Sequence, residues 1–345
     1  MFYICSGAAI ISIAILRLKP FTLHKKLALT ACLLTVYILA STLWANNIPP
    51  VANIAYHSKR AFEIIALLLL IGCFFDVSYH KPLFRLSVAV ATLHAAVIIP
   101  FHNLNARLPN PIDTAMIFGI AAIIALHFAL KEQNPQSALF FAAYAILLIV
   151  ILMSKSRGPQ LALIITSIAV MVLQKKHLHK IVPYAVCSIA LICLITLKTN
   201  VFTKIFSRGF SVNQRDLLWK ETILNSFDNF WFGFGMQKKL FIHLPNGNSY
   251  THSHNFIMDT FRLTGLTGFC IIVFLYLYAL HQGFNSKMSD YQLWALILLF
   301  GSLCLMTNGK IPFTRPGHAW LAFWVPIAMI CTLPQATAKV SRDTQ

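Results

Sequence analysis

Long apolar runs separated by short polar connections repeat along almost the whole chain. Residues 27–45, LALTACLLTVYILASTLWA, carry no charge over nearly the length needed to cross a ~30 Å hydrocarbon core. The same pattern predicts membrane-spanning helices at residues 2–16, 27–45, 61–79, 86–101, 114–130, 137–153, 159–174, 181–197, 256–280, 291–307 and 319–333. We therefore expect an all-α polytopic integral membrane protein with about eleven or twelve spans.

One connection is much longer than the others: residues 198–253 form a long polar loop between the eighth and ninth predicted spans. The expected organisation is an N-terminal set of spans in residues 1–197, a long loop in residues 198–255, and a C-terminal set of spans with a tail in residues 256–345. Within the loop, residues 213–227 alternate apolar and polar side chains at helical spacing. This segment is predicted to be a short amphipathic helix along the membrane surface.

Composition strengthens the membrane assignment, because 58% of the 345 residues are hydrophobic and only 11% are charged. A soluble chain of this size cannot bury that much apolar surface. The eight cysteines lie in or beside apolar runs, which indicates small helix residues rather than disulfides or metal ligands. The first residues, MFYICSGAAIISIAIL, lack a basic segment and a cleavage site, so we interpret them as a first span.

The formal net charge of +18 reflects membrane topology rather than nucleic-acid binding. The first, third, fifth, seventh and ninth connections and the C-terminal tail carry most of the Lys and Arg of the short connections. The positive-inside rule therefore places this set in the cytoplasm. Residues 154–160, 198–253 and 308–318 then lie together on the opposite face.

The long loop carries seven basic residues against three acidic ones, although it is expected to lie outside the cytoplasm. The topology rule does not explain this excess, which indicates either an anionic ligand or contact with lipid headgroups. Residues 154–160, SKSRGPQ, add Lys155 and Arg157 on the same face. Arg157 can bind a phosphate through two hydrogen bonds and cannot lose its charge. Anchoring at the membrane interface is the alternative for both residues.

His254 lies where the loop is predicted to become a helix, beside Asn255. A helix N-terminus disfavours a charged imidazolium, and a neutral imidazole can accept a proton as a general base. A polar surface histidine is the simpler alternative. A metal site formed with His252 is disfavoured, because no Cys, Asp or Glu stands nearby at ligand spacing.

The remaining charged residues of the spans have structural explanations. Glu63 and Asp76 are expected near helix ends, where pairing or reaching the interface suffices. Asp259 and Arg262 are spaced so that they can pair on one helix.

Several motifs together resemble the O-antigen ligases. Arg157 is followed after three residues by Leu161, and Arg215 precedes an aromatic-rich segment. His254-Asn255 is followed after nine residues by a Gly-x-x-Gly motif at 265–268. NQRDLLW at 213–219 and FGFG at 232–235 resemble the loop signature of the broader superfamily of O-antigen ligases and polymerases. The resemblance covers about residues 110–335, and the family usually has twelve spans with a cytoplasmic N-terminus.

The resemblance implies a glycosyltransferase of lipopolysaccharide assembly in the inner membrane of Gram-negative bacteria. Such enzymes move a glycan from undecaprenyl diphosphate to a sugar of lipid A–core on the periplasmic face, within the membrane lipids and without nucleic acid, metal or cofactor. In this hypothesis His254 is the general base, and Arg157 and Arg215 bind the leaving diphosphate, with inversion at the anomeric carbon. Further substrate-binding candidates are Lys155, His252, Asn255, Lys238, Lys239, Lys310 and Arg315.

Three alternatives remain open from the sequence. An O-antigen polymerase would use the same donor with a second lipid-linked glycan as acceptor, and a related transferase would glycosylate protein hydroxyls. A transporter or flippase belongs to a different class. Transporters place charged and helix-breaking residues at mid-membrane and often show repeats, whereas the polar chemistry here gathers outside the membrane.

Overall fold

The computed structural model describes residues 24–45, 50–102, 110–132, 135–154, 156–176, 214–236, 241–245, 247–309 and 311–333. The predicted spans at 2–16 and 181–197 lie outside the described residues.

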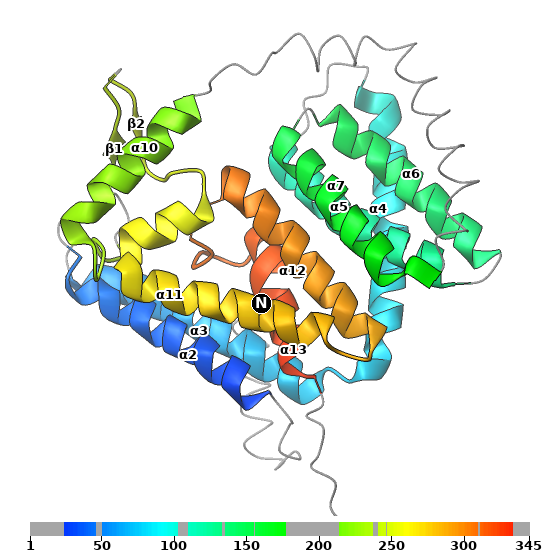
Figure 1. Ribbon diagram of the computed structural model, residues 1–345, viewed down its shortest axis with the longest axis horizontal. Coiled ribbons are helices and arrows are strands. Elements are labelled where there is room, and N and C mark those ends of the chain that lie inside the picture. The colour runs from blue at the N-terminus through cyan, green and yellow to red at the C-terminus, as the bar shows by residue number, and fades with distance from the viewer. Residues whose placement is uncertain are drawn as a thin grey trace, which may run out of the picture.

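A bundle of helices makes up most of the described chain, and α10 with a small hairpin stands at one side of it (Figure 1). The helices of the first part are α2 (Lys25–Ala40), α3 (Pro50–Phe74), α4 (His80–His102), α5 (Pro111–Lys131), α6 (Gln136–Met153) and α7 (Arg157–Leu173). Those of the second part are α10 (Gln214–Ser226), α11 (Phe256–Phe284), α12 (Ser289–Asn308) and α13 (Val325–Cys331). Short helical turns are η1 (Ser41–Leu43), η2 (Val77–Tyr79), η4 (Phe227–Asn229) and the π-helical η5 (Trp320–Trp324).

Six helices in the described residues are long and apolar enough to cross a membrane. α7 and the continuous η5–α13 segment are shorter apolar helices. The chain is therefore a polytopic helical membrane protein, as predicted. The hairpin is an addition to the predicted all-α class: β1 (Ile242–His243) pairs antiparallel with β2 (Ser249–Tyr250) inside the long loop.

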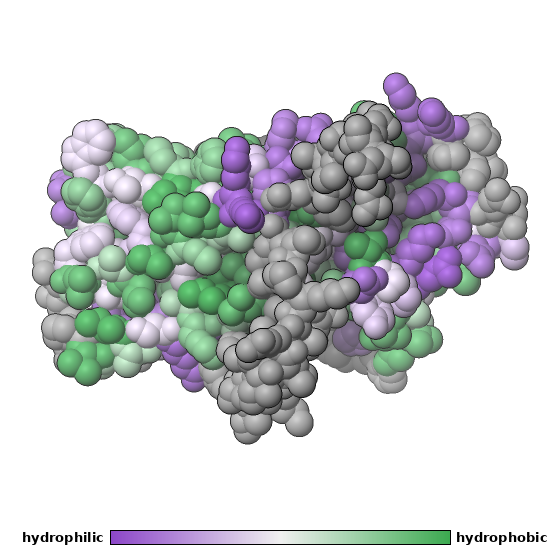
Figure 2. Space-filling model, turned by 90° about the horizontal axis from the view of Figure 1, so that it is seen from below, coloured by the Kyte–Doolittle hydropathy of each residue, from purple (hydrophilic) through white to green (hydrophobic). Residues whose placement is uncertain are grey.

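The centre of the bundle is α5, in which almost every residue between Ala115 and Leu130 is buried. α6, α7 and α12 pack around it, and α11 packs along α2. Other helices turn apolar side chains outward, as the outer face of α4 shows with Leu86, Val90, Leu93 and Val97. Figure 2 shows large hydrophobic areas on one face of the molecule. Lipid is the solvent that such a surface requires.

The predicted limits differ most at the third span, and the span predicted at 86–101 also starts earlier, at His80 of α4. The span expected at 61–79 is α3, which starts at Pro50 and ends at Phe74, and η2 follows it as a separate turn. Glu63 is consequently in the middle of α3 rather than near its end, buried and bonded to Arg60 at 2.5 Å. Asp76 does lie at a helix end, where its Oδ1 accepts from the Ser78 N–H of η2 at 2.8 Å. A buried, neutralised pair explains how α3 carries charge within the bundle.

The two ends of the bundle are each held by contacts between connections that the sequence predicts on one face. At one end the His24 N–H donates to the Cys331 carbonyl at 2.7 Å, and Tyr291 donates to the Thr332 carbonyl at 3.0 Å. At the other end, the side chain of Asn53 donates to the Met236 carbonyl at 2.8 Å. This second end also holds the start of α7, the loop before α11 and the last turn of α12.

Candidate active site

The long loop is joined to α11 through a break in that helix at Gly265, where φ is 62°. In an uninterrupted helix, Leu266 and Thr267 would donate to the carbonyls of residues 262 and 263. Here the Leu266 N–H donates to Phe230 at 2.8 Å, and the Thr267 N–H donates to Trp231 at 3.2 Å. The freed carbonyls of Arg262 and Leu263 accept from Phe234 at 3.1 Å and Gly235 at 2.9 Å.

Two glycines make this junction possible. Both Gly265 and Gly233 have positive φ, at 62° and 68°. A Cβ on Gly265 would lie 2.5 Å from backbone atoms of residues 231–233, and one on Gly233 would meet the backbone of residues 263–265. The first glycine of the Gly-x-x-Gly motif therefore fixes the loop against the membrane helix by direct backbone contact.

His254 and Asn255 form the turn that starts α11. The Asn255 side-chain oxygen accepts from the N–H groups of Ile257 at 3.0 Å and Met258 at 3.2 Å, which is an N-cap arrangement. His254 just before it adopts a positive φ of 55°, which is uncommon for a residue with a side chain. The Asn255 side-chain oxygen is therefore used to cap α11. The same turn fixes the backbone of His254 and so the position of its ring.

The His254 ring is held on two sides. Its Nδ1 lies 3.0 Å from the Oδ1 of Asn308, the last residue of α12, and the His252 ring packs edge-on with centroids 4.2 Å apart. Because an amide oxygen accepts, this hydrogen bond places the proton on Nδ1 and leaves the lone pair on Nε2. Burial, together with the nearby His252 and Arg215, lowers the pKa of His254 below its usual 6.5, although Asn308 and Asp259 raise it. A neutral imidazole at pH 7 is the result.

Arg215 and the turn that carries Arg157 both contact Thr307, the residue before Asn308 in α12. The Arg215 Nη1 donates to the Thr307 carbonyl at 2.8 Å. Gly158 packs so closely against the Thr307 side chain that a Cβ there would overlap it. The last turn of α12 therefore brings together His254 and the two segments carrying Arg157 and Arg215.

A buried ion pair on α11 holds the loops that flank the His254 turn. Arg262 Nη2 bonds Asp259 Oδ1 at 2.8 Å, which confirms the predicted pairing on α11. Asp259 Oδ2 also accepts from the Ile311 N–H at 3.2 Å, and Arg262 donates to the Thr251 carbonyl at 3.1 Å. The pair therefore ties α11 to the loops on both sides of the His254 turn. Sequence spacing indicated the pair but not these links.

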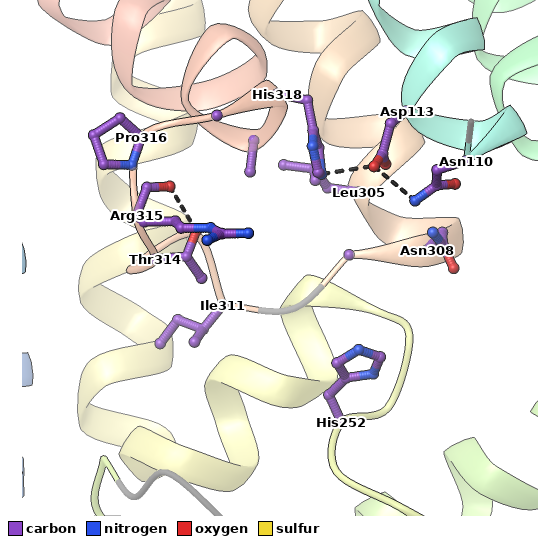
Figure 3. Close-up of a pocket in the computed structure, with 13 residues that line it drawn as sticks. Asn110, Asp113, His252, Leu305, Asn308, Ile311, Thr314, Arg315, Pro316 and His318 are labelled. Carbon is purple, nitrogen blue, oxygen red and sulfur yellow. Dashed lines mark hydrogen bonds and ion pairs between the residues drawn. The ribbon is translucent and has the colours of Figure 1, made fainter. Parts of the chain in front are cut away.

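Of the other candidates, Arg315 and His252 line a cavity of about 710 Å³ beside the His254 turn (Figure 3). Its remaining wall is formed by Asn110, Asp113, Leu305, Asn308, Gly309, Ile311, Thr314, Pro316, Gly317, His318 and Ala319. Lys155, Lys238, Lys239 and Lys310 lie outside the described residues. Among the described residues, no group of three or more His, Cys, Asp or Glu is arranged to hold a metal ion.

Sequence reasoning missed Thr307, Asn308, Asp113 and His318. A polar pair at the end of an apolar run and an Asp in the first turn of a span are common features of membrane helices. Only the packing of α5, α7 and α12 makes these residues neighbours of the candidates, so no signal in the sequence distinguished them.

Comparison with known proteins shows what the chain is similar to. Residues 142–273 match a family model described as O-antigen ligase. A protein of Pseudomonas aeruginosa named O-antigen ligase is 24% identical over 354 residues, covering 96% of this chain and 84% of that protein.

The matched region contains the three residues to which the sequence assigns the chemistry. Its limits of 142 and 273 include Arg157, Arg215, His254 and the Gly-x-x-Gly motif. The last turn of α12, with Thr307 and Asn308, lies beyond the matched region and completes the site from the C-terminal side. The chain is therefore similar to an O-antigen ligase over most of its length.

The lowered pKa of His254 predicts the pH profile of this enzyme. If His254 is the general base, its neutral form is the active one, so activity should be constant above the pKa and fall as the pH decreases through it, at a pH below 6.5. His252→Gln removes a neighbour that lowers the pKa of His254, so the acid limb of kcat/KM should move upward. His243→Gln, on the exposed hairpin, is the control and should leave the limb in place. An unchanged limb in His252→Gln would contradict the assignment.

Proposed function

We propose that the protein is an O-antigen ligase, which transfers O-antigen polysaccharide from undecaprenyl diphosphate to a sugar hydroxyl of lipid A–core. The observation that carries this proposal is the last turn of α12. Its Asn308 orients the His254 ring, and its Thr307 binds Arg215 and packs against the turn of Arg157. A base beside a cation, with the segment of a second arginine packed on the same turn, is suited to the displacement of a diphosphate by a hydroxyl.

The reaction is a single displacement. Nε2 of His254 takes the proton from the acceptor hydroxyl while its oxygen attacks the anomeric carbon of the donor. The bond from that carbon to the diphosphate oxygen breaks, and the electron pair leaves with the diphosphate. Attack opposite to the leaving group inverts the anomeric configuration.

The arginines stabilise the charge that grows on the diphosphate. Arg215 has five N–H donors and the bond to Thr307 uses one of them, so the fork remains able to bind phosphate oxygens. Arg157 begins α7 and is exposed at the same end of the bundle. Arg315, which lines the neighbouring cavity, supplies a further positive charge for anionic groups of the substrates.

We place the site on the periplasmic face of the inner membrane of a Gram-negative bacterium. The distribution of Lys and Arg supports this face, because the basic connections of the opposite set indicate the cytoplasm. Lipid-linked glycans of this kind are long and polar, and a site that opens at the membrane surface admits them without carrying sugar through the bilayer.

Deleting the gene and examining both lipopolysaccharide and the undecaprenyl-linked pool tests the function. The expected result is bare lipid A–core together with long glycans still on the lipid carrier, reversed by the wild-type gene. Core carrying a single repeat unit would instead identify a polymerase. Unchanged lipopolysaccharide would contradict both activities and favour a transporter or another acceptor.

Arg215→Ala should reduce transfer by ~10²–10³-fold, the usual effect of removing one preorganised donor to developing charge. The transfer rate of Arg215→Lys should lie between those of the wild type and Arg215→Ala, since lysine keeps the charge but not the planar fork. Initial rates with the purified protein measure both. Arg85→Ala is the matched control, because Arg85 binds Glu132 at 3.0 Å at the opposite end of the bundle. Equal losses in the Arg85 and Arg215 variants would indicate a structural role.

A further inference from the structure

The cavity beside His254 is lined by neutral polar side chains and by charged groups of both signs. Its volume of about 710 Å³ lies within the ~300–1,000 Å³ typical of small-molecule sites. It is bounded by the start of α5, the end of α12 and the loop before η5. Figure 3 shows His252 at one end of it and Asn110, Asp113 and His318 at the other.

Three side chains from two distant parts of the sequence are linked at that far end. His318 Nε2 lies 3.3 Å from Asp113 Oδ1, and the Asn110 side chain donates to Asp113 Oδ2 at 2.6 Å. The pair is accessible from the cavity, since 41% of the His318 side chain and 26% of the Asp113 side chain are exposed. A carboxylate has about four lone-pair positions, so each oxygen of Asp113 keeps one for a ligand.

This arrangement is suited to sugar hydroxyls. A hydroxyl both donates and accepts, so a carboxylate beside an imidazole and an amide can bind adjacent hydroxyls of one ring. A diphosphate would meet the Asp113 carboxylate and be repelled. Neither Arg157 nor Arg215 is among the residues that line the cavity in the described part of the chain.

The cavity is also connected to the base. Asn308 lines it and bonds His254, and His252 lines it and contacts the His254 ring. In a single displacement the attacking hydroxyl approaches from the side opposite the diphosphate. If Arg157 and Arg215 hold the diphosphate beside Thr307, the acceptor enters from the side where the base and the cavity lie.

On this geometry we propose that the cavity binds the acceptor oligosaccharide, with Asp113 and His318 holding hydroxyls of the sugar that receives the glycan. The proposal rests on the proposed function, since it assigns the acceptor side of that reaction. Arg315 faces the same cavity and pairs with an anionic substituent of the oligosaccharide. Asp113 and His318 are then residues that select the acceptor, while His254 performs the chemistry.

A purely structural role for Asp113 is the rival explanation. Asn110 caps α5 by accepting from the Ile112 N–H at 3.3 Å, and its bond to Asp113 stabilises that cap. Asp113→Asn alone would therefore not distinguish the two roles. His318 lies outside α5 and takes no part in the cap, so His318→Gln separates acceptor binding from helix stability.

The test is steady-state kinetics of the full-length purified protein with undecaprenyl-diphosphate-linked glycan and lipid A–core, varying each substrate in turn. We expect His318→Gln and Asp113→Asn to raise the KM for lipid A–core about tenfold or more, the usual effect of losing a hydrogen bond to a charged group. The KM for the donor and the thermal unfolding temperature of His318→Gln should stay at the wild-type values. Asp228→Asn, on the exposed turn η4, is the control for a lost carboxylate.

A rise in the KM for the donor instead would assign the cavity to the donor glycan and overturn the proposal. Unchanged KM values for both substrates in His318→Gln would overturn it as well. Wild-type protein that transfers no glycan to lipid A–core would overturn the proposed function first, and the acceptor assignment with it. If only Asp113→Asn loses activity, and it does so because the protein unfolds, the role of Asp113 is structural and the cavity does not bind the acceptor.

Discussion

Replacing His254 by alanine should lower the rate of glycan transfer by ~10²–10⁴-fold, the usual contribution of a positioned general base. The ring is held by Asn308 and His252 with Nε2 left to accept a proton, so its loss removes the group that activates the hydroxyl. Donor binding should persist, because Arg157 and Arg215 remain. Initial rates and donor binding of the purified variant measure the two effects.

His243→Ala is the matched control for this variant, since His243 lies in the same loop but on the exposed hairpin, where its Nδ1 is 2.9 Å from the Ser249 hydroxyl. It should transfer glycan at the wild-type rate. A stable His254→Ala protein that restores full-length lipopolysaccharide in a deletion strain would refute the general-base assignment.

Gly265→Ala should prevent the long loop from docking on α11 and so reduce both folded yield and activity severely. At φ 62° and ψ −169° the backbone is in a region that essentially only glycine occupies, so an alanine there costs about 1–3 kcal/mol in backbone strain alone. The added Cβ would also lie 2.5 Å from the backbone of residues 231–233, which cannot move without breaking the hydrogen bonds between the loop and α11. Buried hydrogen bonds left unmade add a further cost of about 1–3 kcal/mol each. Yield of monodisperse protein and its unfolding temperature measure the effect.

Gly247→Ala separates crowding from strain in this comparison. Gly247 has a φ of 84°, yet a Cβ there would meet nothing within 4 Å. It should therefore suffer only the backbone strain and remain close to the wild type in yield and transfer rate. If the two alanine variants lose stability equally, the close approach at Gly265 does not matter and the junction is not what holds the loop.

The sequence was informative where one segment alone determines the structure. Apolar runs predicted α6 and α12 almost to the residue, because lipid demands a minimum length of uninterrupted helix. α3 departed from this rule, since Lys59 and Arg60 made the residues before position 61 look like a connection. Arg60 is paired with Glu63 inside the bundle, and hydropathy does not register such pairing.

The candidate site was predictable in its chemistry but not in its assembly. His254, Arg157 and Arg215 were found from residue type and position alone. Their common support on Thr307 and Asn308 joins segments that lie far apart along the chain, which only tertiary packing brings together. The Asp113–His318 pair had no local pattern of any kind.

The break in α11 constrains how the protein is made. A helix interrupted at Gly265 exposes the N–H groups of Leu266 and Thr267 and two carbonyls, which cannot remain without partners in hydrocarbon. Residues 230–235 of the loop satisfy all four, and they are synthesised before α11. If the loop lies on the periplasmic face, as we propose, it has to be translocated before α11 can reach its final structure. On that view α11 becomes stable only when residues 230–235 bind to it.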